Sequence, residues 1–266
     1  MYKLIALDMD GTLLQSDGTV SKETQEALKQ SREQGVMVTL STGRPFQGVL
    51  DYIDQLGLSG PMITYNGAMI VEVEGRKIVF HQSLKADDAR QVINLGLERD
   101  TTIILWSDNK LYVNRYDDHA KVYEGIAKTK AIVIEDYEQV IKEGITKVLW
   151  FDNVENTNRY LVELVGKVNE SVNYCTSRPY FLEFFDGNVS KAEAMAFIGK
   201  TYDIKQEEMM AIGDGFNDLS MLEYAGLGVA MGNAEDGVKI KADYVTRSND
   251  DNGIANVIES FILKAE

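Results

Sequence analysis

The sequence predicts an α/β protein with a parallel-sheet core, into which a second domain of α+β type is inserted. Short apolar runs alternate with helical patterns at both ends of the chain, as in strands joined by crossover helices. Between about residues 84 and 185 the order changes to helix, hairpin, strand, helix, hairpin. The chain has 266 residues, enough for a core domain plus an insert. We therefore assign residues 1–83 and 186–266 to the core and residues 84–185 to the insert.

The first apolar run, residues 4–7, continues into Asp8-Met9-Asp10-Gly11-Thr12. This pattern is typical of a buried strand that carries carboxylates to its C-terminal end, where open α/β sheets bind ligands. Residues two apart in an extended backbone point to the same side, so Asp8 and Asp10 can share one small space. Two converging carboxylates repel each other and call for a cation or a shared proton. Taken alone, the pattern also fits a strand that ends in an ordinary Asp-Gly turn.

The next elements complete a βαβ unit, which implies a parallel pair of strands. Ser21 begins a helix and Gly35 ends it. Its inward positions follow helical spacing: Thr24, Ala27, Leu28 and Ser31. The strand at residues 36–40 then runs into Ser41-Thr42-Gly43-Arg44-Pro45, at the same sheet edge as Asp8. Hydroxyls, backbone N–H groups and a guanidinium suit a phosphate. A capped turn into a helix at residues 46–56 explains them equally well.

A third strand around Ile63 leads into Tyr65-Asn66-Gly67-Ala68, and residues 69–82 resemble a hairpin with its tip at Glu74-Gly75. The insert is predicted to form a sheet with helices on one face. Its predicted helices span residues 86–99 and 156–170. Its predicted strands span residues 102–106, 111–113, 145–151, 171–176 and 180–185.

The pattern of the core resumes after the insert. Ser190-Lys191-Ala192-Glu193 is a capping box, which places Lys191 in the first turn of a helix that faces inward with Ala194, Phe197 and Ile198. A cation at a helix N-terminus makes an anion site, although an exposed lysine near a cap is the simpler interpretation. An apolar strand at residues 209–212 then runs into Gly213-Asp214-Gly215-Phe216-Asn217-Asp218. The last predicted elements are a helix at residues 219–225, strands at 227–231 and 244–246, and a helix at 254–263.

Composition narrows the class of protein. The chain has 27 basic and 42 acidic residues and a net charge of −15, which disfavours nucleic acids and anionic membranes as partners. One cysteine, Cys175, cannot form an internal disulfide, and we expect it to be a small buried residue without a catalytic role. With no leader pattern and no membrane-spanning run, a cytoplasmic protein is expected. Only His81 and His119 are present, which argues against histidine metal sites and Ser-His hydrolases. The oligomeric state stays open between a monomer and a weak dimer.

Four loops at the predicted sheet edge thus carry Asp8 and Asp10, then Thr42-Gly43, then Lys191, then Asp214, Asn217 and Asp218. In motif types and order the chain resembles the haloacid dehalogenase-like hydrolases. The mixed α/β insert after the second motif, together with Tyr65-Asn66-Gly67-Ala68, resembles the Cof-type sugar-phosphatase branch with its large (type IIB) cap. The resemblance covers essentially the whole chain. It implies a Rossmann-like core, with the insert as an α+β cap domain.

The resemblance implies a role for each motif. Asp8 is expected to be the nucleophile that forms an aspartyl-phosphate, and Asp10 the general acid and base. Mg²⁺ is expected to bind Asp8, the backbone carbonyl of Asp10, and Asp214, with Asp218 supporting these ligands. The residues expected to hold the phosphoryl oxygens are Met9 and Gly43 through their N–H groups, Thr42, Lys191 and Asn217.

The predicted function is therefore a Mg²⁺-dependent phosphatase for small phosphorylated metabolites, in particular sugar phosphates. A phosphomutase, or a non-catalytic protein that binds phosphorylated metabolites, is the alternative. Because the core loops bind the phosphate, which all such substrates share, we expect the insert to determine which substrate is accepted. Its turn Ser177-Arg178-Pro179-Tyr180 offers a cation and an aromatic ring, and Arg44 is expected to meet the same ligand from the core. A solvated turn with a structural tyrosine is the alternative interpretation.

Overall fold

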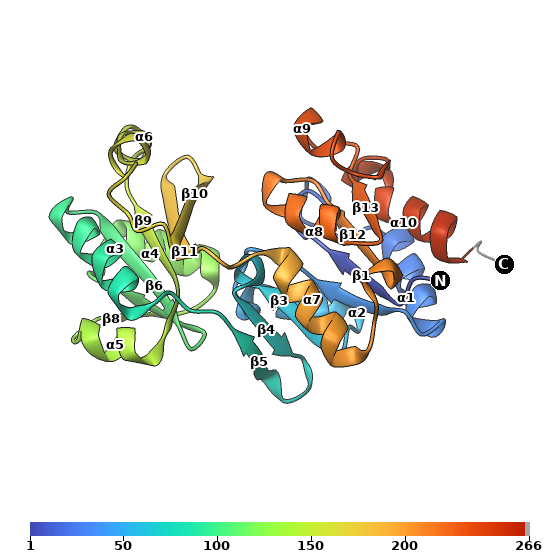
Figure 1. Cartoon of the computed structure of the whole chain (residues 1–266), viewed down its shortest axis with the longest axis horizontal. Helices are drawn as coiled ribbons and strands as arrows, with labels where there is room; N and C mark the ends of the chain where they lie inside the picture. Colours follow the sequence, from blue (N-terminus) through green and yellow to red (C-terminus); the bar gives the residue numbers. More distant parts are fainter. Residues whose placement is uncertain (264–266) are drawn as a thin grey trace. The chain divides into compact units, whose positions relative to one another are not determined.

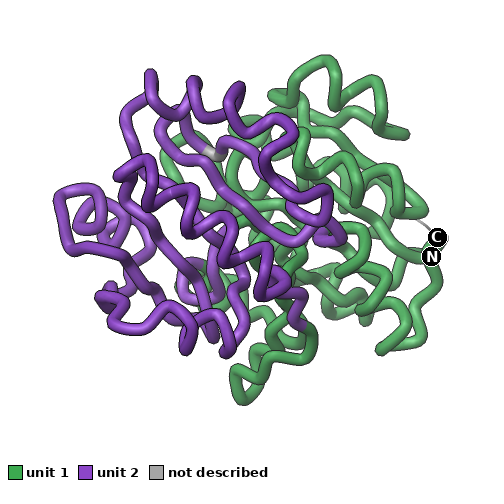
Figure 2. Tube along the Cα trace, turned by 60° about the vertical axis from the view of Figure 1, so that its left-hand side comes forward, with its two compact units in different colours: residues 1–43, 49–80, 190–266 green, residues 44–48, 81–189 purple. Residues whose placement is uncertain are grey.

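The computed structural model describes residues 1–263, apart from the side chain of Ser177 (Figure 1). The chain divides into two compact units, drawn in green and purple in Figure 2. Unit 1 comprises Met1–Gly43, Val49–Phe80 and the chain from Ser190 onward. Unit 2 comprises Arg44–Gly48 and His81–Val189.

Unit 1 is built on a five-stranded sheet in which all neighbouring strands run parallel, as predicted. The order is β14-β13-β12-β1-β2. The strands are β1 (Leu4–Leu7), β2 (Met37–Leu40), β12 (Met209–Gly213), β13 (Leu227–Ala230) and β14 (Tyr244–Val245). Every residue of β1 and β12 is buried, which matches their continuous apolar sequences. The loops that follow β1, β2 and β12 therefore leave the sheet at one edge.

The helices of unit 1 flank this sheet. They are α1 (Lys22–Glu33), α2 (Leu50–Leu56), α7 (Lys191–Tyr202), α8 (Leu219–Tyr224), α9 (Asp236–Lys239) and α10 (Gly253–Ile258). Helices α1 and α10 pack together, as do α7 and α8. Residues of α7 and α8 share one hydrophobic cluster with Leu4 and Ala6 of β1, so this pair of helices covers the face to which those two residues point.

Local signals determine where the two longest helices of unit 1 begin. The Ser21 hydroxyl accepts a hydrogen bond from the Thr24 N–H at 3.2 Å, and the Ser190 hydroxyl accepts one from the Glu193 N–H at 3.1 Å. Such caps contribute about 1 kcal/mol each. The buried residues of α1 are the predicted ones: Thr24, Ala27, Leu28 and Ser31. In α7, Ala194 and Ile198 are buried, whereas Phe197 is partly exposed and lies against Phe80.

A second, three-stranded sheet in the order β3-β4-β5 is formed by β3 (Pro61–Thr64), β4 (Met69–Glu72) and β5 (Lys77–His81). β3 and β4 pair antiparallel, and β3 meets the end of β2 through a single parallel bridge between Ser41 and Ile63. The predicted third strand therefore belongs to this small sheet, while its C-terminal end still lies beside the loop that follows β2.

Unit 2 contains a six-stranded sheet in the order β10-β11-β9-β6-β7-β8. Its strands are β6 (Thr102–Ser107), β7 (Lys110–Val113), β8 (Ala131–Val133), β9 (Ile145–Phe151), β10 (Val172–Arg178) and β11 (Phe181–Asp186). Its helices are α3 (Ala86–Glu98), α4 (Asp118–Ala127), α5 (Tyr137–Glu143) and α6 (Val154–Glu163). All strand neighbours run antiparallel except β7 and β8, so the unit is α+β, as predicted.

The prediction that all helices of the insert lie on one face is wrong. Helices α3, α5 and α6 share one core cluster with Leu105 of β6. The next residue, Trp106, points to the opposite face, where its indole N–H donates to the Tyr123 hydroxyl of α4 at 3.0 Å. Tyr123 also meets the ring of Phe181 edge-on. Helix α4 therefore packs on the face that the sequence pattern left uncovered.

Two further expectations need correction. Helix α6 ends at Glu163 rather than residue 170, because the chain soon reaches Gly166 in the left-handed conformation, with φ of +73°. Cys175 is exposed rather than buried, because it lies on β10, the edge strand of its sheet. Among residues 1–263, no helix is both long enough and apolar enough to span a bilayer.

Candidate active site

The loop after β1 is folded tightly around two carbonyls. The carbonyl of Asp8 accepts the Leu13 N–H at 3.2 Å, and that of Met9 accepts the Leu14 N–H at 2.9 Å. Asp8 itself is only 5% exposed, whereas Asp10 is exposed. Gly11 has φ of +86°, and a Cβ on it would lie 2.3 Å from Oδ2 of Asp214. Only glycine lets this loop approach Asp214 so closely.

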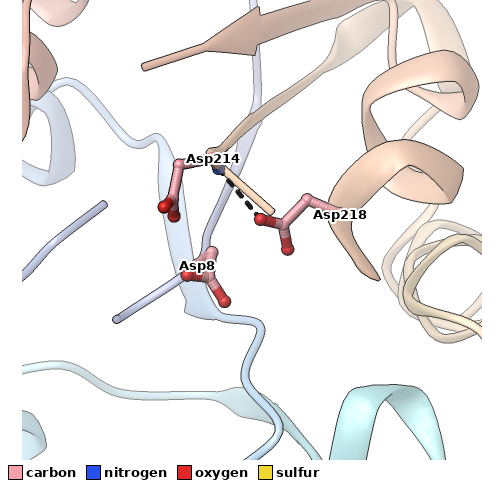
Figure 3. A group of neighbouring side chains, drawn as sticks. All are labelled: Asp8, Asp214 and Asp218. Atoms are coloured by element: carbon pink, nitrogen blue, oxygen red, sulfur yellow. Dashed lines mark hydrogen bonds between the residues drawn. The ribbon is translucent and has the colours of Figure 1, made fainter. Parts of the chain in front are cut away.

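The loop after β12 supplies two more carboxylates. Oδ2 of Asp218 accepts the N–H groups of Asp214 and Gly215, at 2.9 and 2.8 Å. The Thr12 hydroxyl donates to Oδ1 of Asp214 at 2.8 Å. Figure 3 shows the carboxylates of Asp8, Asp214 and Asp218 around one small space. Each offers an oxygen, and the three oxygens lie within 4.8 Å of one another.

Lys191, at the start of α7, is fully buried among these carboxylates. Its ammonium group donates to Oδ1 of Asp8 at 2.6 Å and to Oδ1 of Asp218 at 2.5 Å. Burial opposes the charge of Lys191, but the carboxylates of Asp218 and Asp8 outweigh it and raise the pKa of its ammonium group. The lysine is therefore a fixed positive charge in this site rather than the exposed residue of the simpler interpretation.

Negative charge is still in excess. Burial raises the pKa of Asp8 to about 8, against the opposing effect of Lys191 and with a further increase from Asp218. Burial also raises the pKa of Asp214 to about 6, although the hydrogen bond from Thr12 opposes the shift. Three crowded carboxylates with one ammonium group favour a further cation, and oxygen ligands suit a hard divalent ion. The donor set of this site thus fits Mg²⁺.

The other core residues singled out in the sequence lie on the same sheet edge. Thr42 is buried, and its N–H donates to the Ile63 carbonyl at 3.0 Å. Asn217 is exposed and donates from its side-chain amide to Oδ1 of Asn66 at 3.2 Å. The structure thus adds two residues for which the sequence indicated no role, Thr12 and Asn66. The dipeptide Asn66-Gly67 predicts a turn, but nothing in the local sequence indicates that the side chain of Asn66 reaches Asn217.

The candidate specificity residues belong to unit 2. Arg178 is exposed and donates to the Tyr180 hydroxyl at 3.2 Å, and the Tyr180 ring stacks on Phe151 with centroids 5.4 Å apart. Ser177 lies outside the residues whose side chains are described. Arg44, expected on the core side, falls in the segment Arg44–Gly48, which groups with unit 2. Its guanidinium donates to the Gly48 carbonyl at 3.4 Å.

Fold and site together define a class of protein. Carboxylates gathered at the carboxyl edge of a parallel sheet around a buried ammonium group are typical of α/β enzymes that act on small anionic substrates with the help of a cation.

Comparison with known proteins identifies the family. The model of the haloacid dehalogenase-like hydrolases matches residues 5–258, and the chain belongs to this family. It is 37% identical to "Putative phosphatase YxeH" of Bacillus subtilis (strain 168), over 99% of each chain. It is 30% identical, over 97% of each, to the 5-amino-6-(5-phospho-D-ribitylamino)uracil phosphatase YitU of the same organism. Among solved structures, the subclass IIB sugar phosphatase BT4131 matches with a TM-score of 0.82 at 25% identity, over 97% of this chain and 98% of that one.

These matches confirm the resemblance stated from the motifs. The protein is an enzyme of the phosphatase class, with the α/β core and additional α+β domain of its family.

Proposed function

We propose that the protein is a Mg²⁺-dependent phosphatase that hydrolyses small phosphorylated metabolites, sugar phosphates in particular, through an aspartyl-phosphate intermediate. One observation carries the proposal: Asp8 is held by Lys191 within a cluster of three carboxylates, of which those of Asp8 and Asp218 are buried and that of Asp214 is partly buried. A buried carboxylate hydrogen-bonded to a fixed cation is oriented for attack and needs no separate base. We also propose that the protein is cytoplasmic. Its single cysteine, which cannot form an internal disulfide, is compatible with that compartment.

In the first half-reaction, a carboxylate oxygen of Asp8 forms a bond to phosphorus while the bond from phosphorus to the leaving oxygen breaks. Asp10 gives its proton to the departing alkoxide. In the second half-reaction, Asp10 takes a proton from water, and the resulting hydroxide attacks phosphorus. Inorganic phosphate leaves and Asp8 is free again. Asp10 is exposed, so both the leaving group and water can reach it.

The remaining roles are those that the family resemblance implies, and the contacts are compatible with them. Lys191, Thr42, Asn217 and the N–H groups of Met9 and Gly43 would hold the phosphoryl oxygens. Asp8, the Asp10 carbonyl and Asp214 would hold Mg²⁺, which when bound offsets negative charge on the phosphoryl group. Asp218 would support the metal ligands without binding the metal itself, because its oxygens already accept hydrogen bonds from Lys191 and from the N–H groups of Asp214 and Gly215. Thr12 would fix the side chain of Asp214.

Metal removal should abolish turnover. Dialysis against excess chelator is expected to lower phosphate release to background, since burial raises the pKa of Asp8 to about 8 and, without a bound cation, favours its protonated form, which is a poor nucleophile. Added Mg²⁺ should restore the rate, whereas an equal concentration of NaCl, as the control, should not. Unchanged turnover in excess chelator would contradict the metal requirement.

One relative is named a sugar phosphatase and another a uracil-derivative phosphatase, so both are compatible with this family fold. A screen of phosphorylated metabolites with inorganic phosphate as the readout tests the proposal directly. Release of phosphate supports a phosphatase, conversion to an isomeric phosphate without release supports the phosphomutase alternative, and binding without turnover supports a non-catalytic protein.

We further propose that the insert, residues 84–185 on the sequence-based borders, is the cap that selects the substrate, through Arg178 and Tyr180 with Arg44. Supporting this, the guanidinium of Arg178 and the hydroxyl of Tyr180 are already joined by a hydrogen bond. Such a pair offers a cation and an aromatic ring in one place.

Arg178→Ala and Tyr180→Ala are expected to lower kcat/KM for the best metabolite about tenfold, and for p-nitrophenyl phosphate much less, because the nitrophenyl leaving group lacks the hydroxyl and amine groups by which a metabolite is recognised. Arg159→Ala is the matched control, since Arg159 is likewise an exposed arginine of the insert beside a tyrosine, Tyr160 on α6. Equal losses on both substrates would argue against this turn as the specificity element.

A further inference from the structure

The turn Tyr65-Asn66-Gly67 has an unusual backbone. Its three residues have φ of +51°, +57° and +103° in succession, and only the last is a glycine. A left-handed backbone costs free energy for any residue with a Cβ, although less for asparagine than for most. Two such residues side by side persist only where the surroundings hold them. The contacts of this turn should therefore show what it is for.

The backbone of the turn ties together two loops of the active site. The Asn66 N–H donates to the Thr42 carbonyl at 2.9 Å. Gly67 lies so close to the loop before α7 that an added Cβ would be 2.1 Å from the Ser190 carbonyl oxygen. The turn thus contacts the loop that carries Thr42 and the loop that precedes Lys191, although it belongs to neither of them.

The side chain of Asn66 lies between the loop after β2 and the loop after β12. Its amide group lies 3.1 Å from the place where a Cβ on Gly43 would be. Its Oδ1 accepts a hydrogen bond from Nδ2 of Asn217 at 3.2 Å. The Oδ1 atom of Asn217 points the other way: it would lie 2.3 Å from a Cβ added to Gly215. The Asn217 amide is therefore fixed in orientation, with its oxygen toward Gly215 and its NH₂ group toward Asn66.

We propose that Asn66 is a positioning residue for phosphate binding: it orients the amide of Asn217 so that one N–H is bound by Asn66 and the second is free to donate to a phosphoryl oxygen. This inference rests on the proposed function, since it concerns the residues that hold the phosphate. The unfavourable backbone at residues 65 and 66 is retained because only this turn brings the side chain of Asn66 between Gly43 and Asn217.

A double-mutant cycle tests this. Asn66→Gly keeps the left-handed backbone, which glycine adopts readily, and removes only the side chain. It is expected to lower kcat/KM for p-nitrophenyl phosphate about five- to tenfold, the effect of one hydrogen bond, and to weaken inhibition by inorganic phosphate by a similar factor. Because Asn66 acts through Asn217, the pair Asn66→Gly and Asn217→Ala together should be no worse than Asn217→Ala alone.

Asp203→Gly is the matched control. Asp203 is also left-handed, with φ of +54°, but follows the C-terminal end of α7, the end opposite Lys191. It should change neither kinetic constant nor phosphate inhibition. If Asn66→Gly leaves both constants unchanged, or if its effect multiplies fully with that of Asn217→Ala, the inference is overturned while the phosphatase stands. If the unchanged protein releases no phosphate from any ester in the presence of Mg²⁺, the proposed function fails, and this inference with it.

Discussion

Replacing Asp8 by Asn is expected to abolish phosphate release while leaving the protein folded. An amide cannot attack phosphorus as a carboxylate does, and removal of a catalytic nucleophile costs roughly 10⁴-fold or more in kcat. Folding should survive because the amide oxygen of Asn can still accept the hydrogen bond that Lys191 gives to Asp8. Burial disfavours the charge of Asp8, so the neutral side chain should make the metal-free protein at pH 7 at least as stable.

The measurement combines steady-state phosphate release with thermal unfolding. Asp54→Asn is the matched control, because Asp54 is an exposed carboxylate of α2 in the same unit, and its replacement should leave kcat unchanged. Near-normal turnover by Asp8→Asn would rule out the aspartyl-phosphate route. An unfolded variant would instead show that the site depends on the charge of Asp8 for stability.

Lys191→Met is expected to have the largest effect on stability. It removes the ammonium group that contacts Asp8 and Asp218, and it leaves two buried carboxylates without that positive charge beside them. Breaking a buried ion pair in this way costs about 3–5 kcal/mol in the free energy of unfolding. The loss should be largest at neutral pH and smaller at acidic pH, where protonation removes the uncompensated charge. Phosphate release should also fall to background.

Urea unfolding at two pH values checks this, with Lys200→Met as the control. Lys200 is on the same helix but exposed, so its replacement should change the free energy of unfolding by well under 1 kcal/mol. If Lys191→Met is as stable as the unchanged protein at neutral pH, the ion pairs of Lys191 do not hold the site together.

The elements that the sequence predicts best are those with strong local signals. Helix α1 follows the serine cap and the helical spacing of its buried residues, and β1 follows an uninterrupted apolar run. The same applies to the site: Asp8 and Lys191 each lie beside a strand end or a helix cap that the sequence marks. Their meeting is not local, since they are 183 positions apart. Because α7 leads into β12, which runs parallel to β1, the N-terminal end of α7 lies at the edge of the sheet where β1 ends.

The parts that the sequence does not reveal depend on contacts between distant segments. Helices α4 and α5 are short and rich in charged residues, and strand β8 has only three residues, so their patterns are weak. The face to which α4 packs is decided by Tyr123 meeting Trp106 and Phe181. The hydrogen bond from Asn217 to Asn66 spans 151 positions and joins two surface-type residues, a contact that periodicity and propensity cannot indicate.

The order of strands in the core sheet has a consequence for synthesis on the ribosome. β1 lies between β2 and β12 in this sheet, and its Leu4 pairs with Met209 of β12. The first strand to be synthesised therefore cannot complete its pairing until β12, more than 200 residues later, has been made. Residues 81–189 are contiguous and contain a complete six-stranded sheet, which can form while the rest is still being translated. A nascent chain that stops before residue 190 would lack Lys191, Asp214 and Asp218. The growing polypeptide should therefore show no phosphatase activity until the final third of the chain has left the ribosome.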